Sequence, residues 1–321
     1  MVFGVTGEED DMVAKRRGLR GYRLIILAIV GAVLAVFGAL WVGIIFPSLD
    51  KMPADYERTL YFDGSFSVMN PATFTMDSFP IEQTLAQEAI GTEDGALLIH
   101  EVSTVINADT GEDISAIYGD ESTLAIDAHT LEFMPQVDER GRWGQFGPPR
   151  PLGVGDSFAL WNPGAQQALM ANYVGKEDFR GLGVLVFEID EADIPIGTEP
   201  TSGMELYLSP KVTLWIEPSS GTVVNQTSET TTSINFMGTM MPVQIANVDY
   251  AEETIVDLMG TAQSARTMLL WFRTLVPWMA IGFGTFLVIS SATIVAVRDV
   301  RKLRARKQTR LPEPTSLPLD R

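Results

Sequence analysis

The stretch KVTLWIEPSSGTVV at residues 211–224 has the pattern of two β-strands joined by a tight turn. Polar and apolar side chains alternate before the turn, which is typical of a strand with one buried face. Pro218 is favoured at the start of a turn, and Gly221 can adopt the positive φ that ends it. The apolar side chains expected on the buried face are Val212, Leu214 and Ile216. The stretch therefore predicts a β-hairpin within an antiparallel sheet.

Strand-like runs recur on both sides of this hairpin. They lie at residues 59–69, 72–86, 95–108, 122–134, 179–190 and 241–252. Within the first run, Asp63-Gly64 is a hairpin or bulge signal. Many short strands at this spacing predict a mainly β domain, either an antiparallel β-sandwich or a strongly curved sheet.

Two segments interrupt the strand pattern. Residues 136–156 are rich in Gly and Pro and lack periodicity, so we expect a loop that crosses between two halves of the domain. Residues 161–175, WNPGAQQALMANYVG, are expected to hold a short helical turn. The β-rich part is thus expected to consist of two groups of strands.

Two uncharged apolar runs flank the β-rich part. Residues 24–46 and 275–297 are each 23 residues long, and about 20 apolar residues cross a bilayer as a helix. The first run exceeds the roughly 7–15 residues of a signal-peptide core, so we expect a retained anchor. Basic side chains cluster just before the first run and just after the second. This pattern favours both termini in the cytoplasm and the β domain outside it.

The expected organisation is a two-pass protein of the cell membrane. Its parts are a cytoplasmic tail (1–23), a transmembrane helix (24–46), an extracytoplasmic β-rich domain (47–250), a helical stalk (251–274), a second transmembrane helix (275–297) and a basic cytoplasmic tail (298–321). The stalk is expected because apolar side chains follow helical spacing there. This stripe consists of Ile255, Leu258, Met259, Ala262 and Leu269.

The part between the apolar runs is strongly acidic. Residues 47–274 hold 34 acidic and 10 basic side chains, a formal net charge of −24. Such a surface repels phosphate, so we expect no nucleic-acid partner. The acidic clusters at 107–121 and 187–195 lack the EF-hand pattern and read more simply as turns and strand ends, although divalent-cation binding is the alternative. We expect no metal and no cofactor.

Few residues of the β-rich part suggest catalysis. The two histidines, His100 and His129, each lie in a strand-like run without a nucleophile motif, whereas a hydrolase needs both in a defined arrangement. The chain has no cysteine, which excludes thiol catalysis. We therefore expect a protein that is not an enzyme and has no catalytic residues.

Both apolar runs carry small residues at helical spacing. They are Ala28, Ala32, Ala35, Ala39 and Gly43 in the first run, and Ala280, Gly284 and Ser291 in the second. Small side chains let two helix backbones approach closely. The stripes predict helix packing, either of these two helices against each other or between copies of the chain.

Three stretches carry a resemblance to a known family. They are ANYVGKEDFRGLGVLVFEI (171–189), VTLWIEPSSGTVV (212–224) and VDYAEETIVDLMGTAQ (248–263). With the order helix, β domain, helix, they resemble the PorA-type porin family of bacterial two-pass membrane proteins, over nearly the whole chain. The resemblance implies a cell-envelope protein and carries a porin label. A porin barrel crosses the membrane with strands, so conduction by this chain would require an oligomer of its helices.

These observations favour a non-enzymatic envelope protein whose β domain binds a lipid, an envelope polymer or a partner protein. The alternatives are a channel or channel subunit, and a scaffold without a ligand. The partners expected are membrane lipids, other envelope proteins or further copies of the chain. The candidate binding residues are Trp161, Asn162, Pro163 and Trp215.

Overall fold

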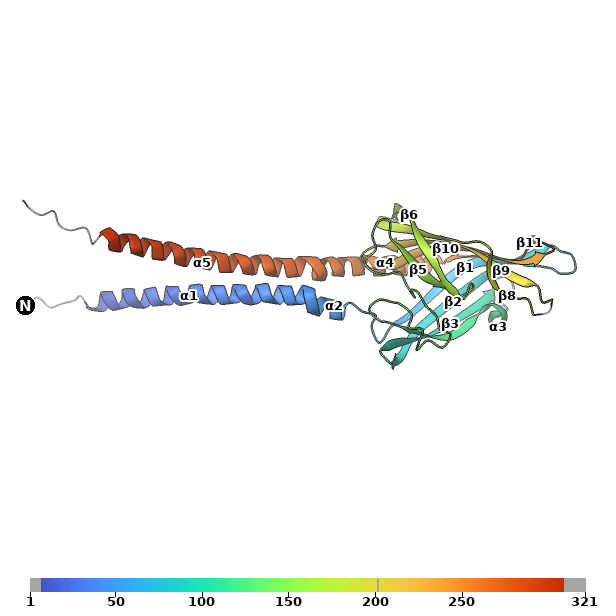
Figure 1. The fold of residues 1–321 in the computed structure, drawn as a ribbon, viewed down its shortest axis with the longest axis horizontal. Helices are drawn as coiled ribbons and strands as arrows, with labels where there is room; N and C mark the ends of the chain where they lie inside the picture. The colour runs from blue at the N-terminus through green and yellow to red at the C-terminus, as the bar shows by residue number, and fades with distance from the viewer. Residues whose placement is uncertain (1–6, 201, 309–321) are drawn as a thin grey trace, which may run out of the picture. The chain divides into compact units, whose positions relative to one another are not determined.

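The computed structural model describes residues 7–200 and 202–308. They form two compact units (Figure 1). Asp50–Leu269 is the β-rich unit, and the described parts of Met1–Leu49 and Leu270–Arg321 make a helical unit. A β domain between two apolar helical segments is thus confirmed.

The chain contains eleven strands and five α-helices among the described residues. The strands are β1 (Glu57–Met69), β2 (Met76–Glu93), β3 (Ala96–Asn107), β4 (Asp120–Ile126), β5 (Ser157–Asn162), β6 (Gln167–Phe179), β7 (Leu182–Asp190), β8 (Ile194–Thr198), β9 (Glu205–Glu217), β10 (Thr222–Phe236) and β11 (Thr239–Tyr250). The helices are α1 (Gly7–Leu40), α2 (Phe46–Leu49), α3 (Ser115–Tyr118), α4 (Glu252–Leu269) and α5 (Val276–Gln308), with π-helical turns η1 (Trp41–Ile45) and η2 (Leu270–Leu275).

All eleven strands belong to one antiparallel sheet. Its order is β4-β3-β2-β1-β11-β10-β9-β7-β6-β5, with β8 paired to β9. The hairpin at 211–224 is β9–β10, and Gly221 has the expected positive φ of 70°. Val212, Leu214 and Ile216 are buried as predicted. Of the two fold classes expected, the structure has the single curved sheet, because one continuous hydrogen-bonded order leaves no second sheet among the described strands.

The segment between β4 and β5 joins the two edges of this sheet. Isolated bridges link Ile126 of β4 to Phe133, Glu132 to Gln145, and Gln145 to Leu160 of β5. The two edge strands, β4 and β5, are therefore linked through this segment by isolated bridges. The expected crossover loop at 136–156 thus also connects the two halves by hydrogen bonds.

Two local expectations are wrong. β1 runs through Asp63-Gly64 without a turn or register shift. A Cβ on Gly64 would overlap the carbonyl oxygen of Asn247 on β11, so glycine is required there for close strand approach. Residues 161–175 hold no helical turn; they form the β5–β6 hairpin.

Helix α4 packs on the β-rich unit with its apolar stripe. Ile255, Leu258, Met259 and Ala262 are buried in one cluster with Leu182, Val184 and Val224 of the sheet. Two polar contacts fix its first turn. Arg180 donates two hydrogen bonds to Glu252 at 2.6 and 2.8 Å, and the hydroxyl of Thr254 bonds both the N–H and the C=O of Tyr61. The residues expected to form a stalk are therefore largely a packing helix of the β domain.

In the helical unit, α1 and α5 lie side by side (Figure 1). Their backbones approach closely at Gly31 and Gly284, where a Cβ on Gly284 would lie 2.5 Å from the Gly31 oxygen and 2.7 Å from the Ala35 nitrogen. A Cβ on Gly38 would lie 2.9 Å from the Pro277 oxygen. Small residues at this interface permit the close approach.

The small-residue stripes lie partly at this contact. Gly284 and Ser291 are buried and Ala28, Ala35 and Ala280 are half-buried, whereas Ala32, Ala39 and Gly43 are exposed. The face of α1 toward α5 follows positions 28, 31, 35 and 38, because steps of three and four keep residues on one side of a helix. The exposed residues Ala32, Ala39 and Gly43 remain candidates for contacts between chains.

The described residues contain two helical stretches long and apolar enough to cross a membrane. One lies within Tyr22–Leu49 and the other within Glu252–Arg304. The π-helical turns η1 and η2 are tied together, since the indole N–H of Trp41 donates to the carbonyl oxygen of Phe272 at 2.8 Å. Together with the packed helix pair, these features describe a membrane anchor made of two helices.

Candidate binding cavity

The β-rich unit contains a partly enclosed cavity of about 670 Å³. One of its walls is formed by alternate residues of β1, β2, β3 and β4, such as Arg58, Leu60 and Phe62 of β1. Alternate residues of a strand share one face, so the cavity lies in the hollow of the curved sheet. Its size falls within the roughly 300–1,000 Å³ of small-molecule sites.

Charge is distributed unevenly around the cavity wall. The charged lining residues are Arg58, Glu101, Asp120, Arg140 and Arg142, all on β1–β4 or the segment after β4. The lining residues of β5, β7, β9, β10 and β11 are uncharged, and the apolar ones are Leu160, Trp161, Ile189, Val212, Leu214, Val223 and Val248. All the charge thus lies on one wall, which also carries the apolar residues Leu60, Phe62, Leu85 and Leu124, whereas the wall of β5, β7, β9, β10 and β11 is uncharged and largely apolar.

A row of polar residues crosses the charged wall. Arg58 on β1 is paired with Gln87 on β2, Gln87 with Glu101 on β3, and Glu101 with Ser122 on β4. All four line the cavity. We call these four residues the polar row. Cross-strand partners have neighbouring side chains on one face, so the polar row is continuous across four strands.

Hydrogen bonds fix the centre of the polar row. The hydroxyl of Tyr56 donates to Oε1 of Gln87 at 2.8 Å, and Nε2 of Gln87 donates to Oε2 of Glu101 at 2.6 Å. Burial raises the pKa of Glu101, although the hydrogen bond from Gln87 opposes the rise. Burial likewise raises the pKa of Tyr56, against the nearby Arg58 guanidinium. Glu101 is thus a carboxyl group held in place at a weakly solvated position.

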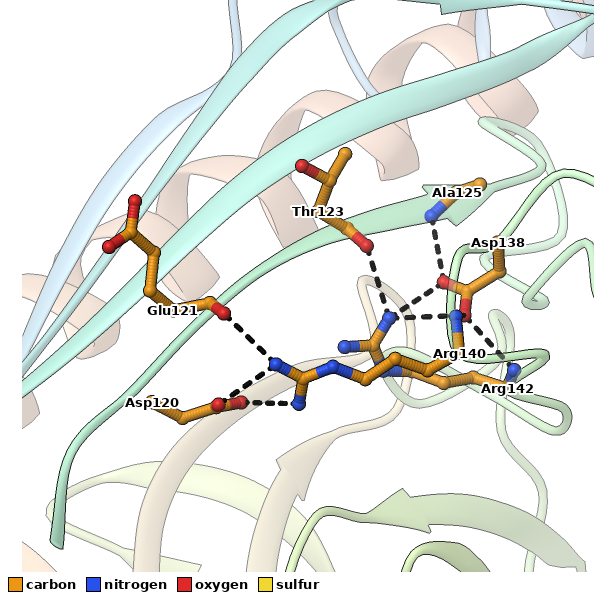
Figure 2. Close-up of polar contacts among 7 residues, drawn as sticks. All are labelled: Asp120, Glu121, Thr123, Ala125, Asp138, Arg140 and Arg142. Atoms are coloured by element: carbon orange, nitrogen blue, oxygen red, sulfur yellow. Dashed lines mark hydrogen bonds and ion pairs between the residues drawn. The ribbon is translucent and has the colours of Figure 1, made fainter. Parts of the chain in front are cut away.

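Two arginines after β4 are anchored by carboxylates (Figure 2). Arg140 forms two hydrogen bonds to Asp120 at 2.8 and 2.9 Å and a third to the carbonyl of Glu121. This pairing lowers the pKa of Asp120. Arg142 contacts both oxygens of Asp138 and the carbonyl of Thr123. The positive charges of both arginines are therefore matched within the wall itself.

Asp138 organises the backbone of this wall (Figure 2). Its carboxylate accepts hydrogen bonds from the N–H groups of Ala125, Arg140 and Arg142. The side chains of Asp138 and Arg142 are only 0% and 2% exposed. A buried charge is tolerated when it is paired and fully hydrogen-bonded, so this pair fixes the segment after β4 against the edge strand.

Three of the four candidate binding residues line the cavity. Trp161 packs against Phe133 with ring centroids 5.9 Å apart. Its indole N–H donates no hydrogen bond to the residues that the structure describes. Asn162 and Pro163 lie next to it, and the side-chain oxygen of Asn162 accepts from the N–H of Ala165. Trp215 is not a lining residue. Its indole N–H donates to Glu177 at 2.8 Å and its ring packs near Phe179.

Sequence reasoning missed the polar row. Arg58, Gln87 and Glu101 lie in alternating strands, where a polar residue facing a cavity has the same local pattern as one facing solvent. Only the register of four strands brings them together. The acidic clusters and the two histidines form no group of three or more side chains suited to a metal ion, within the residues that the structure describes.

The sequence was also compared with known proteins. No curated protein matches the chain. The family model described as Porin PorA matches residues 25–293, which includes the whole β-rich unit and most of the apolar runs 24–46 and 275–297. Because the match covers most of the chain, the protein belongs to the Porin PorA family.

Proposed function

We propose that this protein is a membrane-anchored, non-enzymatic binding protein of the cell envelope, and that its β domain holds a lipid-like amphiphile in the cavity. The observation that carries the proposal is the division of the cavity wall. All charged lining residues lie on β1–β4 and the following segment, and the wall of β5, β7, β9, β10 and β11 is uncharged. An amphiphile presents the same two chemistries, so its chain suits one wall and its head the other.

The connection of the domain to the anchor supports a lipid as ligand. The chain enters the β-rich unit directly after α2 and leaves it through α4 into η2 and α5. A domain tethered at both ends to membrane helices works at a lipid surface. The acidic charge of the β domain disfavours its adhesion to anionic headgroups. Binding of single lipid molecules in the cavity therefore explains the fold better than adsorption of the domain to the membrane surface.

The direct test is native mass spectrometry of the full-length protein extracted in mild detergent. The proposal predicts a retained amphiphile on the wild type and its loss from Ser228→Phe, because Ser228 lines the cavity. Thr227→Phe is the matched control, since the neighbouring strand residue points to the opposite face. A wild type without any bound amphiphile, even after its addition, would refute the proposal.

We further propose that both termini are cytoplasmic and that the β domain is extracytoplasmic, on the basic residues that flank the two apolar runs. The cysteine-free chain makes single introduced cysteines unambiguous probes. An impermeant maleimide should label Ser202→Cys in intact cells and Lys302→Cys only after permeabilisation. The reverse pattern would overturn the orientation.

A second candidate function is a channel subunit, favoured by the description of the family as porins. Two helices cannot enclose a pore, so several chains would have to assemble. The exposed small residues Ala32, Ala39 and Gly43 offer a face for such contacts. The same mass spectra report stoichiometry, and a ring of four or more chains with measurable conductance would favour this function over ligand binding.

A further inference from the structure

Two opposite charges of the polar row have no ionic partner in the wall. Arg58 and Glu101 both line the cavity, and neither forms an ion pair among the described residues. The other charged lining residues are matched, as Arg140 is paired with Asp120 and Arg142 with Asp138. The unmatched pair is therefore a particular feature of the polar row.

The sheet itself keeps these two charges apart. Gln87 lies between them, because it is the strand partner of Arg58 on one side and of Glu101 on the other. Two strand spacings separate their backbones by about 10 Å. The Gln87 amide is already used on both sides, by the Tyr56 hydroxyl and by the Glu101 carboxylate. The polar row thus offers Arg58 to an anionic group and Glu101 to a cationic group, at a fixed separation.

The nearest polar partners of these two charges are neutral, the Tyr56 hydroxyl for Arg58 and the Gln87 amide for Glu101, and Arg142 and Arg140 act on Glu101 only from beyond ion-pair distance. Partly buried charges without an ion-pair partner are costly, and a ligand that supplies both counter-charges lowers the cost. Resting on the proposed function, we propose that the polar row binds the head of a zwitterionic amphiphile, with its acidic group at Arg58 and a primary ammonium at Glu101. A guanidinium suits phosphate or carboxylate oxygens. A carboxylate accepts hydrogen bonds from the N–H groups of a primary ammonium.

The charge of the whole domain favours the same ligand class. A net charge of −24 between the apolar runs repels an anionic amphiphile on approach. A zwitterion carries no net charge and avoids this repulsion. A purely cationic amphiphile would engage Glu101 but leave Arg58 without a counter-ion. The zwitterion is the class that satisfies both ends of the polar row.

The test measures binding of four probes with one dodecyl chain to full-length protein in amphipol, below the micelle concentration of each probe. The probes are dodecyl phosphoethanolamine, dodecyl phosphate, dodecylamine and dodecyl glycerol. The zwitterion should bind about 10-fold more tightly than the neutral probe. Arg58→Gln and Glu101→Gln should each remove most of this preference, and Arg58→Lys should restore part of it.

Matched controls separate the outcomes. Glu57→Gln, next to Arg58 on β1, and Lys211→Gln, on β9, change exposed charges outside the polar row and should leave the preference unchanged. The unfolding temperature of every variant reports its folding. If all four probes bind equally, the headgroup inference is wrong although the cavity binds amphiphiles. If no probe binds the wild type, the proposed function fails and the inference with it.

Discussion

Arg142 and Asp138 form an ion pair in the interior of the β domain, with Nη1 of the arginine 3.1 and 2.9 Å from the two carboxylate oxygens. The carboxylate also accepts three backbone N–H bonds, from Ala125, Arg140 and Arg142. It thereby fixes the segment that links the two edge strands and the arginine that contacts Asp120. The relationship links the stability of the fold to the shape of the cavity.

Asp138→Ala should destabilise the protein by about 3–5 kcal/mol, because it leaves the Arg142 guanidinium buried without a partner. Chemical unfolding of the full-length protein measures the change. The double variant Asp138→Leu/Arg142→Met removes both charges and should recover part of the loss. A single variant as stable as the wild type would show that the pair does not hold the linking segment.

Glu101 should make stability depend on pH in a defined direction. Burial raises its pKa in the folded protein above the ordinary 4.5. At a pH between the pKa of the unfolded state and the higher pKa of the folded state, the folded state therefore binds more protons than the unfolded state. Its contribution to stability is therefore fully present below about pH 4.5 and is lost as the pH rises through the folded pKa.

The difference in unfolding free energy between Glu101→Gln and the wild type isolates this effect from the rest of the acidic surface. The unfolding free energy of Glu101→Gln should increase relative to that of the wild type as the pH rises from about 4.5 to 7.5. Glu57→Gln, on an exposed position, serves as the control. A difference that is constant over this range would show that the carboxyl group of Glu101 is not destabilised by burial.

Gly64→Ala should destabilise the sheet by about 1–3 kcal/mol, because the added methyl group would overlap the Asn247 carbonyl on the adjacent strand. Gly183→Ala is the matched strand control, as a Cβ there meets no atom within 4 Å. Thermal unfolding compares the two. Equal stabilities would mean that β1 and β11 can separate at this point without cost.

Gly284→Ala should weaken the packing of α1 on α5, because its Cβ would come within 2.5 Å of the Gly31 oxygen. Gly282→Ala places the same methyl group in open space on the same helix and should have little effect. The unfolding temperature of the detergent-solubilised protein should fall for the first variant only. A fall of equal size for both would contradict a specific helix contact.

The sequence predicted those parts of the fold that local pattern determines. The hairpin at 211–224 follows from side-chain alternation and the turn residues Pro218 and Gly221, and the apolar helices follow from length and composition. The Asp63-Gly64 prediction failed because the reason for the glycine lies on β11, about 180 residues further along the chain. Register between distant strands has no local signal.

The cavity could be predicted only in part for the same reason. Trp161, Asn162 and Pro163 do line it, and the aromatic residue followed by the turn residues Asn and Pro is a signal that the sequence carries. Trp215 does not line the cavity. Its indole N–H bonds Glu177, which lies two strands away on β6, and the sequence carries no signal of this partner. The polar row depends on the register of β1 to β4. Alternation gives the face of each residue relative to its neighbours but not which face encloses the hollow.

We expect an amphiphile to occupy the hollow of the sheet. Photo-crosslinking can locate it, with a single-chain amphiphile that carries a diazirine in its tail, added to membranes that contain the full-length protein. Peptide mapping should find the tail on the apolar wall, around Val212, Leu214 and Val248, with labelling lost in Ser228→Phe and kept in Thr227→Phe. Labelling confined to α1 and α5, equal in all three proteins, would contradict the account.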